Sequence, residues 1–240
     1  MILNGLDICA GSGIGSATFE ALGLCKTVCY VEINNYCQRL LQQRMADGWI
    51  NDAPIWDDLR TFDGREWAGK VDFMFGGIPC QPWSVAGKRE GSSDERDLWA
   101  DYYRVLCEIR PRFALVENVP GLLSGDGGKQ FGRILGDLAE VGLDAEWQVI
   151  SAGEFGAQHK RERLWLLAYA YSIGREKVPG ETADRRRTDK PKRNNWWASE
   201  PAVDRVAHGL ADGVDRRQTI GNGWVPQVAA VVAGRIKQLL

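Results

Sequence analysis

The segment that decides the fold runs from residue 71 to residue 82 and reads Val71-Asp72-Phe73-Met74-Phe75-Gly76-Gly77-Ile78-Pro79-Cys80-Gln81-Pro82. Its apolar first half is typical of a buried strand, and the two glycines that follow predict a sharp turn. Open α/β folds place their chemistry at the carboxyl edge of the sheet, where such a turn lies. We therefore interpret Cys80 as a nucleophile presented to a ligand, although most free cysteines are small buried hydrophobic residues.

Strand patterns and helix patterns alternate on both sides of this segment. Strands are expected over residues 2–9, 27–33, 71–75 and 113–116, and helices after Gly15 and over residues 34–45, 98–109 and 131–141. Two later runs, 147–151 and 164–169, are close enough to pair as a hairpin around Gly156. This order predicts an α/β fold with a doubly wound, mostly parallel, Rossmann-like sheet.

The pattern disappears after residue 171 and returns as a helical spacing over residues 225–236, which we expect to pack back on the sheet. We predict a main domain over 1–171, a short irregular insertion over 172–217, and a returning segment over 218–240.

Composition limits the class of protein. The chain has 240 residues, 44% of them hydrophobic, but no run approaches the roughly 18 apolar residues of a membrane span. Because the start lacks a signal-peptide pattern, we expect a cytoplasmic protein without a membrane partner. Six cysteines without a C-x-x-C pair and only two histidines predict no metal site.

The formal net charge is -2, yet basic residues gather between residues 174 and 193. Such a run is commonly a solvated loop, and it is also the charge pattern that binds phosphate.

A glycine turn and a distant carboxylate point to a nucleotide-like ligand. Gly11, Gly13 and Gly15 follow the first strand and let a ligand approach the backbone closely. Glu32 ends the second strand, where a carboxylate can accept hydrogen bonds from both ribose hydroxyls. With Asp58, these residues indicate an adenosine-containing cofactor.

Polar residues also follow the strand at 113–116. A desolvated carboxyl at Glu117 can hold a raised pKa and share a proton near neutral pH, which would serve Cys80. Alternation places Arg161 and Arg163 on one face of the strand that begins near them, so two guanidinium groups should converge on one site.

The Pro79-Cys80-Gln81, Glu117-Asn118-Val119 and Arg161-x-Arg163 elements, in this order, resemble those of the C5-cytosine DNA methyltransferases that use S-adenosylmethionine. The resemblance covers residues 7–119, the Arg163 region and residues 221–226. It implies that Cys80 adds to C6 of cytosine, so that C5 can attack the cofactor methyl group. It also implies that Glu117 contacts N3 and the exocyclic amine and that Arg163 contacts the base carbonyl oxygen. Pro79 and Asn118 would fix the pocket and Arg161 would organise it.

The resemblance also assigns a cofactor site. It puts methionine near the glycine turn, ribose on Glu32 and adenine beside Ile33, Asp58 and Leu59. The residues implied for S-adenosylmethionine are Asp7, Cys9, Gly11, Ser12, Gly13, Ile14, Glu32, Ile33, Asp58, Leu59, Asn222 and Trp224. Cys9 stands where the family usually has phenylalanine, and Trp224 where a small aliphatic residue is common.

The implied partner is double-stranded DNA, bound by a monomer of a bacterial or phage-like type. Because a duplex hides C5 and C6, the target cytosine would have to be flipped out. The insertion at 172–217 takes the place of the family's target-recognition domain, which is generally longer. The residues expected to contact DNA are Gln81, Ser84, Lys88, Arg89, Arg185, Arg186 and Arg187.

Three other functions fit parts of the pattern. An RNA cytosine C5 methyltransferase would use the same chemistry, and a nucleic-acid-binding protein with little turnover would explain the basic run. A nicotinamide-dependent reductase fits Gly11 and Glu32 but does not explain Cys80 together with Glu117.

Overall fold

A computed structural model describes residues 1–79, 97–171, 173 and 223–240. Several predicted site residues lie outside this part of the chain: Cys80, Gln81, Ser84, Lys88, Arg89, Arg185, Arg186, Arg187 and Asn222.

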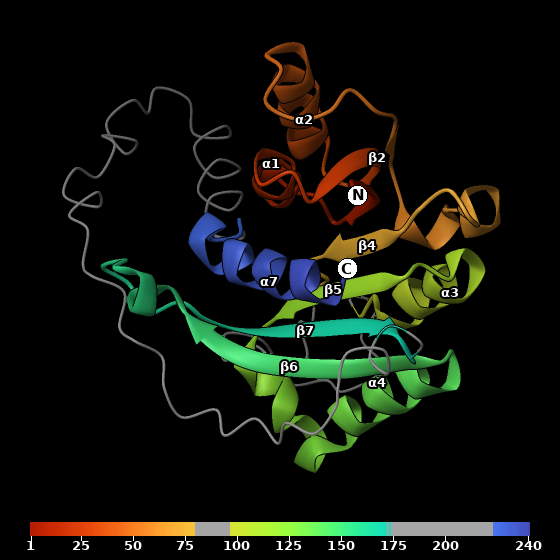
Figure 1. The fold of residues 1–240 in the computed structure, drawn as a ribbon, viewed down its shortest axis with the longest axis vertical. Helices are drawn as coiled ribbons and strands as arrows, with labels where there is room; N and C mark the ends of the chain where they lie inside the picture. The colour runs from red at the N-terminus through yellow and green to blue at the C-terminus, as the bar shows by residue number, and fades with distance from the viewer. Residues whose placement is uncertain (80–96, 172, 174–222) are drawn as a thin grey trace.

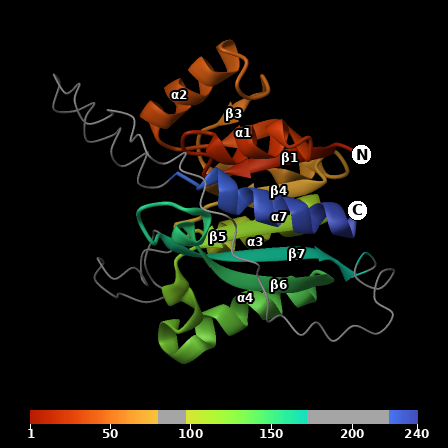
Figure 2. The same ribbon diagram turned by 60° about the vertical axis from the view of Figure 1, so that its left-hand side comes forward.

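The described strands form one seven-stranded sheet in the order β3-β2-β1-β4-β5-β7-β6 (Figures 1 and 2). Five strands are parallel: β1 (Leu3–Ile8), β2 (Cys25–Val31), β3 (Ile55–Trp56), β4 (Phe73–Gly76) and β5 (Phe113–Asn118). The hairpin of β6 (Leu143–Ser151) and β7 (Glu162–Ala170) completes one edge, with β7 antiparallel to β5. The prediction of a mostly parallel α/β sheet with a late hairpin is confirmed.

Helices cover both faces of the sheet, because alternate side chains of each buried strand point to opposite faces. Leu6, Ala114 and Leu166 pack with α3 (Trp99–Ile109) and α4 (Lys129–Glu140) on one face. On the other face, Phe73 and Leu115 pack with α1 (Ile14–Ala21) and α7 (Pro226–Leu239). Helix α2 (Asn35–Ala46) packs its Leu41 against Tyr30 of β2.

The C-terminal segment forms a helix that packs on the sheet, as expected. Helix α7 contacts α1, although the two lie at opposite ends of the chain (Figures 1 and 2). Short 3-10 helices complete the connections: η1 (Leu59–Thr61), η2 (Gly64–Trp67), η5 (Pro120–Leu123), η6 (Gly125–Gly128) and η7 (Ala152–Phe155).

Some boundaries differ from the sequence prediction for physical reasons. Strand β2 ends at Val31, so Glu32 follows the strand instead of belonging to it. Strand β3 pairs over only two residues, which is too short for any periodic pattern to reveal it. Strand β6 begins at Leu143, four residues before the predicted start at 147. The prediction missed this part because Asp144 and Glu146 interrupt its apolar residues.

The order of the strands opens a crevice beside β1. From β1 the chain continues to β2 on one side, whereas β4 pairs with β1 on the other side. The loops that leave the carboxyl ends of β1 and β4 therefore diverge, which is where open α/β sheets bind ligands. At this point Gly76 of β4 lies against the backbone of Ile8, so closely that a Cβ atom there would overlap the Ile8 carbonyl oxygen.

This contact predicts that Gly76→Ala prevents β1 and β4 from pairing, with a loss of more than about 3 kcal/mol in the free energy of unfolding. Urea denaturation, monitored by circular dichroism, would measure this loss of free energy. Gly132→Ala is the matched control, because Gly132 is exposed in α4 with nothing within 4 Å of the added Cβ. The control should be neutral or stabilised by up to about 1 kcal/mol. Equal midpoints for wild type and Gly76→Ala would contradict this account of the crevice.

Candidate active site

A cavity of about 430 Å³ opens at the carboxyl edge of the sheet. Its walls are the segments that follow four parallel strands, with Cys9 after β1, Glu32 after β2, Gly77 after β4 and Val119 after β5. Its volume lies in the range of pockets that hold a drug-sized or cofactor-sized ligand. The full lining is Asp7, Cys9, Ala10, Gly11, Ser12, Ile14, Gly15, Glu32, Ile33, Asn34, Cys37, Gly77, Ile78, Pro79, Leu98, Glu117, Asn118, Val119, Arg161, Arg163, Gly223 and Trp224.

The glycine turn after β1 forms one wall. Gly11 has a φ of 55°, a conformation that side chains disfavour, and its N–H donates to Glu32 Oε2 at 2.7 Å. Cys9 has a φ of 53° without being glycine. Burial raises the pKa of its thiol, so Cys9 is a neutral side chain in this wall.

Ser12 brings a buried hydroxyl to the same wall. Its carbonyl oxygen accepts a hydrogen bond from Arg44 of α2. Its Oγ is buried and has no hydrogen-bond partner among the described residues. A buried hydroxyl without a partner is costly, so a polar ligand group that contacted it would be favoured.

The Glu32 carboxylate is held in place by backbone donors. It is 7% exposed, and its Oε1 accepts the Asn34 N–H at 2.8 Å while Oε2 accepts the Gly11 N–H. The Glu32 N–H donates to the Trp56 carbonyl of β3 at 2.9 Å, which fixes the backbone of this residue as well. Each carboxylate oxygen keeps a further lone pair with which to accept a ligand hydroxyl.

Asp7 is a buried carboxyl at the base of the cavity. Ser16 Oγ donates to its Oδ2 at 2.6 Å, and Thr27 Oγ1 donates to Ser16 at 2.9 Å. Burial raises the pKa of Asp7 to about 7, against the opposing effect of the Ser16 hydrogen bond. This side chain can therefore be protonated near neutral pH.

The opposite end of the cavity holds Glu117 with two arginines. Glu117 is 8% exposed at the end of β5, and Arg163 Nε of β7 lies 3.0 Å from its Oε1. Burial raises the pKa of Glu117 to about 7, although Arg163 and Arg161 both act to lower it. Both guanidinium groups line this cavity, although Arg161 precedes β7 with a φ of 35° and therefore does not share the strand alternation of Arg163.

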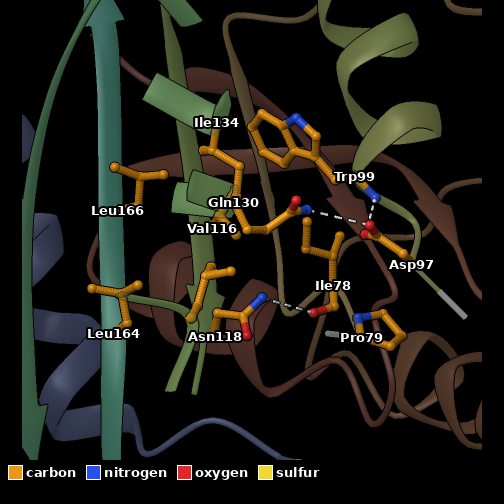
Figure 3. A pocket seen from close by; sticks show the side chains of 11 residues that line it. Ile78, Pro79, Asp97, Trp99, Val116, Asn118, Gln130, Ile134, Leu164 and Leu166 are labelled. Carbon is orange, nitrogen blue, oxygen red and sulfur yellow. Dashed lines mark hydrogen bonds between the residues drawn. The ribbon is translucent and has the colours of Figure 1, made fainter. Parts of the chain in front are cut away.

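Asn118 ties the ends of β4 and β5 together. Its Nδ2 donates to the Ile78 carbonyl at 3.3 Å, and its Oδ1 accepts the Val119 N–H at 2.8 Å. Figure 3 shows Asn118 and Pro79 beside a second, apolar pocket. That pocket has only about 10 Å³, no more than one water molecule needs, so it is part of the packing behind the site.

Across that small pocket, Asp97 accepts hydrogen bonds from the Trp99 N–H at 3.1 Å and from Gln130 Nε2 at 3.4 Å (Figure 3). These bonds join the start of α3 to α4.

Trp224 closes the cavity from the C-terminal segment. Arg161 Nη2 donates to the Gly223 carbonyl at 2.6 Å, which holds this segment beside the two arginines. The Trp224 ring packs edge-on against Trp165 and Phe19. A Cβ atom at Gly15 or Gly77 would lie 3.1 Å from the indole, so both glycines leave room for it.

Most of the predicted site residues in the described part of the chain meet at this cavity. They are Asp7, Cys9, Gly11, Ser12, Ile14, Glu32, Ile33, Pro79, Glu117, Asn118, Arg161, Arg163 and Trp224. Gly13, Asp58 and Leu59 do not line it. Asp58 caps η1 and pairs with Arg60 at 2.8 Å, while Leu59 is buried in the core.

Other lining residues carry no signal in the sequence. Asn34, Cys37 and Val119 lie near predicted residues along the chain, which is the only hint that could have found them. Leu98 comes from the start of α3, and nothing in its local pattern separates it from a core leucine.

Within the described ranges, no helix has the length and apolar character needed to cross a bilayer. The same ranges hold no group of three side chains arranged as metal ligands.

Comparison with known proteins gives a consistent result. The family model described as "C-5 cytosine-specific DNA methylase" matches residues 3–207. The Type II methyltransferase M.NgoMIV of Neisseria gonorrhoeae is 33% identical over 173 residues, which are 70% of this chain and 52% of that protein. M.DsaV of Dactylococcopsis salina is 32% identical over 68% of this chain and 45% of its own length. The chain thus spans about half the length of these curated relatives.

Solved structures share the fold at low sequence identity. A Spodoptera frugiperda DNMT2 mutant aligns with a TM-score of 0.59 and 18% identity over 75% of this chain and 53% of that one. A putative DNA modification methyltransferase encoded within an Escherichia coli prophage aligns with a TM-score of 0.56 and 21% identity. The alignment covers 72% of this chain and 48% of that one. These structures agree with the Rossmann-like sheet described above.

The buried Asp7 carboxyl predicts a specific pH dependence of stability. Because its folded-state pKa of about 7 exceeds the ordinary value of 3.8, the folded state binds the proton more tightly. This contribution favours folding below about pH 4 and is lost as the pH rises toward 7. One pKa unit corresponds to about 1.4 kcal/mol, so the Asp7 carboxyl should lower the free energy of unfolding by a few kcal/mol as the pH rises. Asp7→Asn should abolish this decline.

Urea unfolding at pH 5 and pH 8 would measure this decline in wild type, in Asp7→Asn and in Asp52→Asn. Asp52 is exposed, so its variant removes the same charge and should keep the wild-type slope. If the free energy of unfolding of Asp7→Asn fell between pH 5 and pH 8 as much as that of wild type, the prediction would be contradicted.

Proposed function

The chain belongs to the C-5 cytosine-specific DNA methylase family, and from this premise we propose that it transfers a methyl group from S-adenosylmethionine to C5 of cytosine in duplex DNA. The observation that supports this most is the single cavity that joins two different chemistries. Glu117 and Arg163 lie at one end of it, and the Gly11 turn with Glu32 lies at the other. A base and a methyl donor bound there would face each other.

The residues of the second end fit the cofactor. Glu32 has free lone pairs for ribose hydroxyls, and the unpartnered Ser12 Oγ can bond a polar group of the methionine part. Ile33 is 61% exposed at the cavity and offers an apolar surface to adenine. When bound, S-adenosylmethionine supplies an electrophilic methyl group on its sulfonium. Four further cofactor contacts are proposed on the basis of the family resemblance alone: Asn222, Gly13, Asp58 and Leu59.

The first end fits the activation of cytosine. The Cys80 thiolate, next in the chain after Pro79, adds to C6, and Glu117 gives its proton to N3. The electron pair that this addition places at C5 then takes the methyl group. Loss of the C5 proton to solvent and departure of the sulfur restore the ring, and the N3 proton returns to Glu117. A carboxyl with a pKa of about 7 can give and recover this proton at neutral pH.

Arg163 and Arg161 set the charge around this carboxyl. Arg163 Nε already contacts Glu117 and presents a guanidinium that can also donate to the base carbonyl oxygen. Arg161 is held by the Gly223 carbonyl, so its charge stays near the site.

The substrate part of the proposal concerns residues outside the described ranges. Flipping the cytosine out of the duplex costs about a few kcal/mol, which contacts to phosphate must offset. We assign those contacts to Gln81, Ser84, Lys88 and Arg89, and to Arg185, Arg186 and Arg187 in the recognition insertion at 172–217. We further propose that the protein acts in the cytoplasm as a monomer.

The experiment that tests the reaction is covalent capture. Duplex DNA that contains 5-fluorocytosine, with S-adenosylmethionine, should form an adduct at Cys80, because fluorine at C5 blocks the elimination. Cys80→Ala should form no adduct and lose methyl transfer, yet bind S-adenosylhomocysteine. Cys107→Ala is the matched control, since Cys107 is a free thiol on α3 away from the cavity. Intact mass and peptide mapping would locate the adduct. An adduct with fluorocytosine RNA alone would establish RNA as the substrate, and none with either would indicate a binding protein.

Glu117→Gln tests the proton transfer separately. An amide cannot give a proton to N3, so kcat should fall about 10²- to 10⁴-fold while the affinity for S-adenosylhomocysteine changes little. In wild type, kcat should decline above about pH 7 as Glu117 loses its proton. Single-turnover methylation between pH 6 and 9 would measure this, with the exposed Glu66→Gln as the control. A flat wild-type profile would count against Glu117 as the proton donor.

A further inference from the structure

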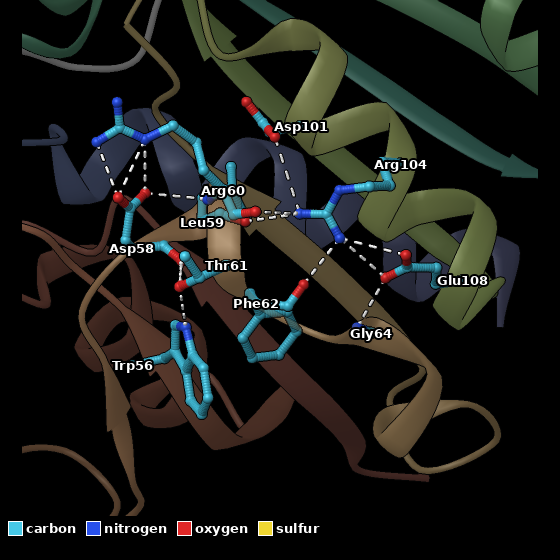
Figure 4. Close-up of polar contacts among 10 residues, drawn as sticks. All are labelled: Trp56, Asp58, Leu59, Arg60, Thr61, Phe62, Gly64, Asp101, Arg104 and Glu108. Atoms are coloured by element: carbon cyan, nitrogen blue, oxygen red, sulfur yellow. Dashed lines mark hydrogen bonds and ion pairs between the residues drawn. The ribbon is translucent and has the colours of Figure 1, made fainter.

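Arg104 of α3 clamps the turn between β3 and β4 (Figure 4). Its Nη1 donates to the Phe62 carbonyl at 2.8 Å, and its Nη2 donates to the Leu59 carbonyl at 2.8 Å. A weaker contact of 3.4 Å joins Nη2 to the Arg60 carbonyl. One guanidinium therefore binds the carbonyls of two residues of the 3-10 helix η1, Leu59 and Arg60, and that of Phe62, which follows it.

Two carboxylates on the same helix hold this guanidinium in place. Glu108 lies one turn after Arg104 and accepts from Nη1 at 3.2 Å, and Asp101 lies 3.8 Å from Nη2. Glu108 Oε2 also accepts the Gly64 N–H at 2.8 Å, at the start of η2. Helix α3 thus holds η1 through Arg104 and η2 through Glu108.

The turn held by Arg104 is connected to the cavity by hydrogen bonds. Thr61 Oγ1 accepts from Trp56 Nε1 at 3.0 Å and donates to the Asp58 carbonyl at 3.0 Å. The carbonyl of Trp56 in turn accepts the Glu32 N–H at 2.9 Å. Residues 55–62 therefore form the backing of Glu32, whose carboxylate lines the cavity.

Strand β3 cannot hold this backing alone. It pairs with β2 over only two residues and has no strand on its other side in the described sheet. Two-residue pairing at a sheet edge is weak, so the position of residues 55–62 depends on what holds the turn that follows. In the structure, the turn is held by the fork of Arg104 together with the buried side chains of Leu59 and Phe62.

We propose that Arg104 is a positioning residue for the adenosine half of the cofactor site, acting through η1 and β3 on the backbone position of Glu32. The inference rests on the proposed function, because it takes S-adenosylmethionine as the ligand of that half. Arg104 itself touches neither the cavity nor the base end. Lysine cannot replace it fully, since one ammonium does not reproduce a planar fork that bonds two carbonyls at once.

Isothermal titration with S-adenosylhomocysteine tests the proposal on the full chain. Arg104→Gln should raise Kd about tenfold or more, and Arg104→Lys should raise it less, because the lysine keeps the charge and one carbonyl contact. In methylation assays the KM for S-adenosylmethionine should rise in the same order while kcat stays within about twofold. Substitution of a residue that only stabilised the fold would not raise KM while leaving kcat nearly unchanged.

Arg65→Gln is the matched control. Arg65 lies in η2 and forms an exposed ion pair with Asp63 at 2.7 Å, so its variant removes a nearby positive charge without touching η1. Its Kd for S-adenosylhomocysteine should equal that of wild type. An increase as large as that of Arg104→Gln would overturn the proposal in favour of a general effect of charge.

Trp56→Phe covers the case in which the Arg104 variants do not fold. It removes the Nε1 bond to Thr61 and keeps a ring beside Phe62, so it should raise Kd several-fold. If wild type binds S-adenosylhomocysteine and neither Trp56→Phe nor a folded Arg104 variant changes Kd, Arg104 has no positioning role and the proposed function stands. If wild type itself does not bind, the proposed cofactor is wrong and the inference falls with it.

Discussion

The structure depends on the close parallel pairing of β1 with β4. Gly5–Ile8 pairs with Phe73–Gly76, and at the last pair the missing Cβ of Gly76 leaves room for the Ile8 carbonyl. Because β1 pairs with β2 on its other side, the chain must leave β1 and β4 in diverging directions. The cavity is the space between those exits, and the C-terminal segment with Trp224 closes it.

Three carboxyl groups lie at this edge, and their partners give each a different chemistry. Asp7 is buried beside the Ser16 hydroxyl and Glu117 is buried beside Arg163, and burial raises both pKa values to about 7. Glu32 instead accepts two backbone N–H groups, from Gly11 and Asn34, which orient both of its oxygens. One group of residues can thus share protons at one end and bind hydroxyls at the other, through environment alone.

The sequence predicted the elements with strong patterns and missed those without one. The buried strands β4 and β5 begin with continuous apolar runs, and α3 and α4 show helical spacing, so their positions were predicted closely. Strand β3 has only two paired residues and therefore no period. Arg104 and Glu108 look like an ordinary solvated pair on a helix, because nothing local reveals that Arg104 meets the carbonyls of Leu59 and Phe62.

By itself, the sequence determined the order of strands and helices apart from β3, the glycine turns, and which acidic residues lie at or after the ends of which strands, because these properties depend on near neighbours in the chain. The tertiary structure decided which of them meet. It brought Arg163 from the antiparallel strand β7 to Glu117 of β5, and it brought Trp224 from the C-terminal segment over Gly15 and Gly77. It left Asp58 and Leu59 outside the cavity lining, as partners of Arg60 and of the core. Contacts between residues this far apart in the chain depend on strand order and packing, which no local pattern contains.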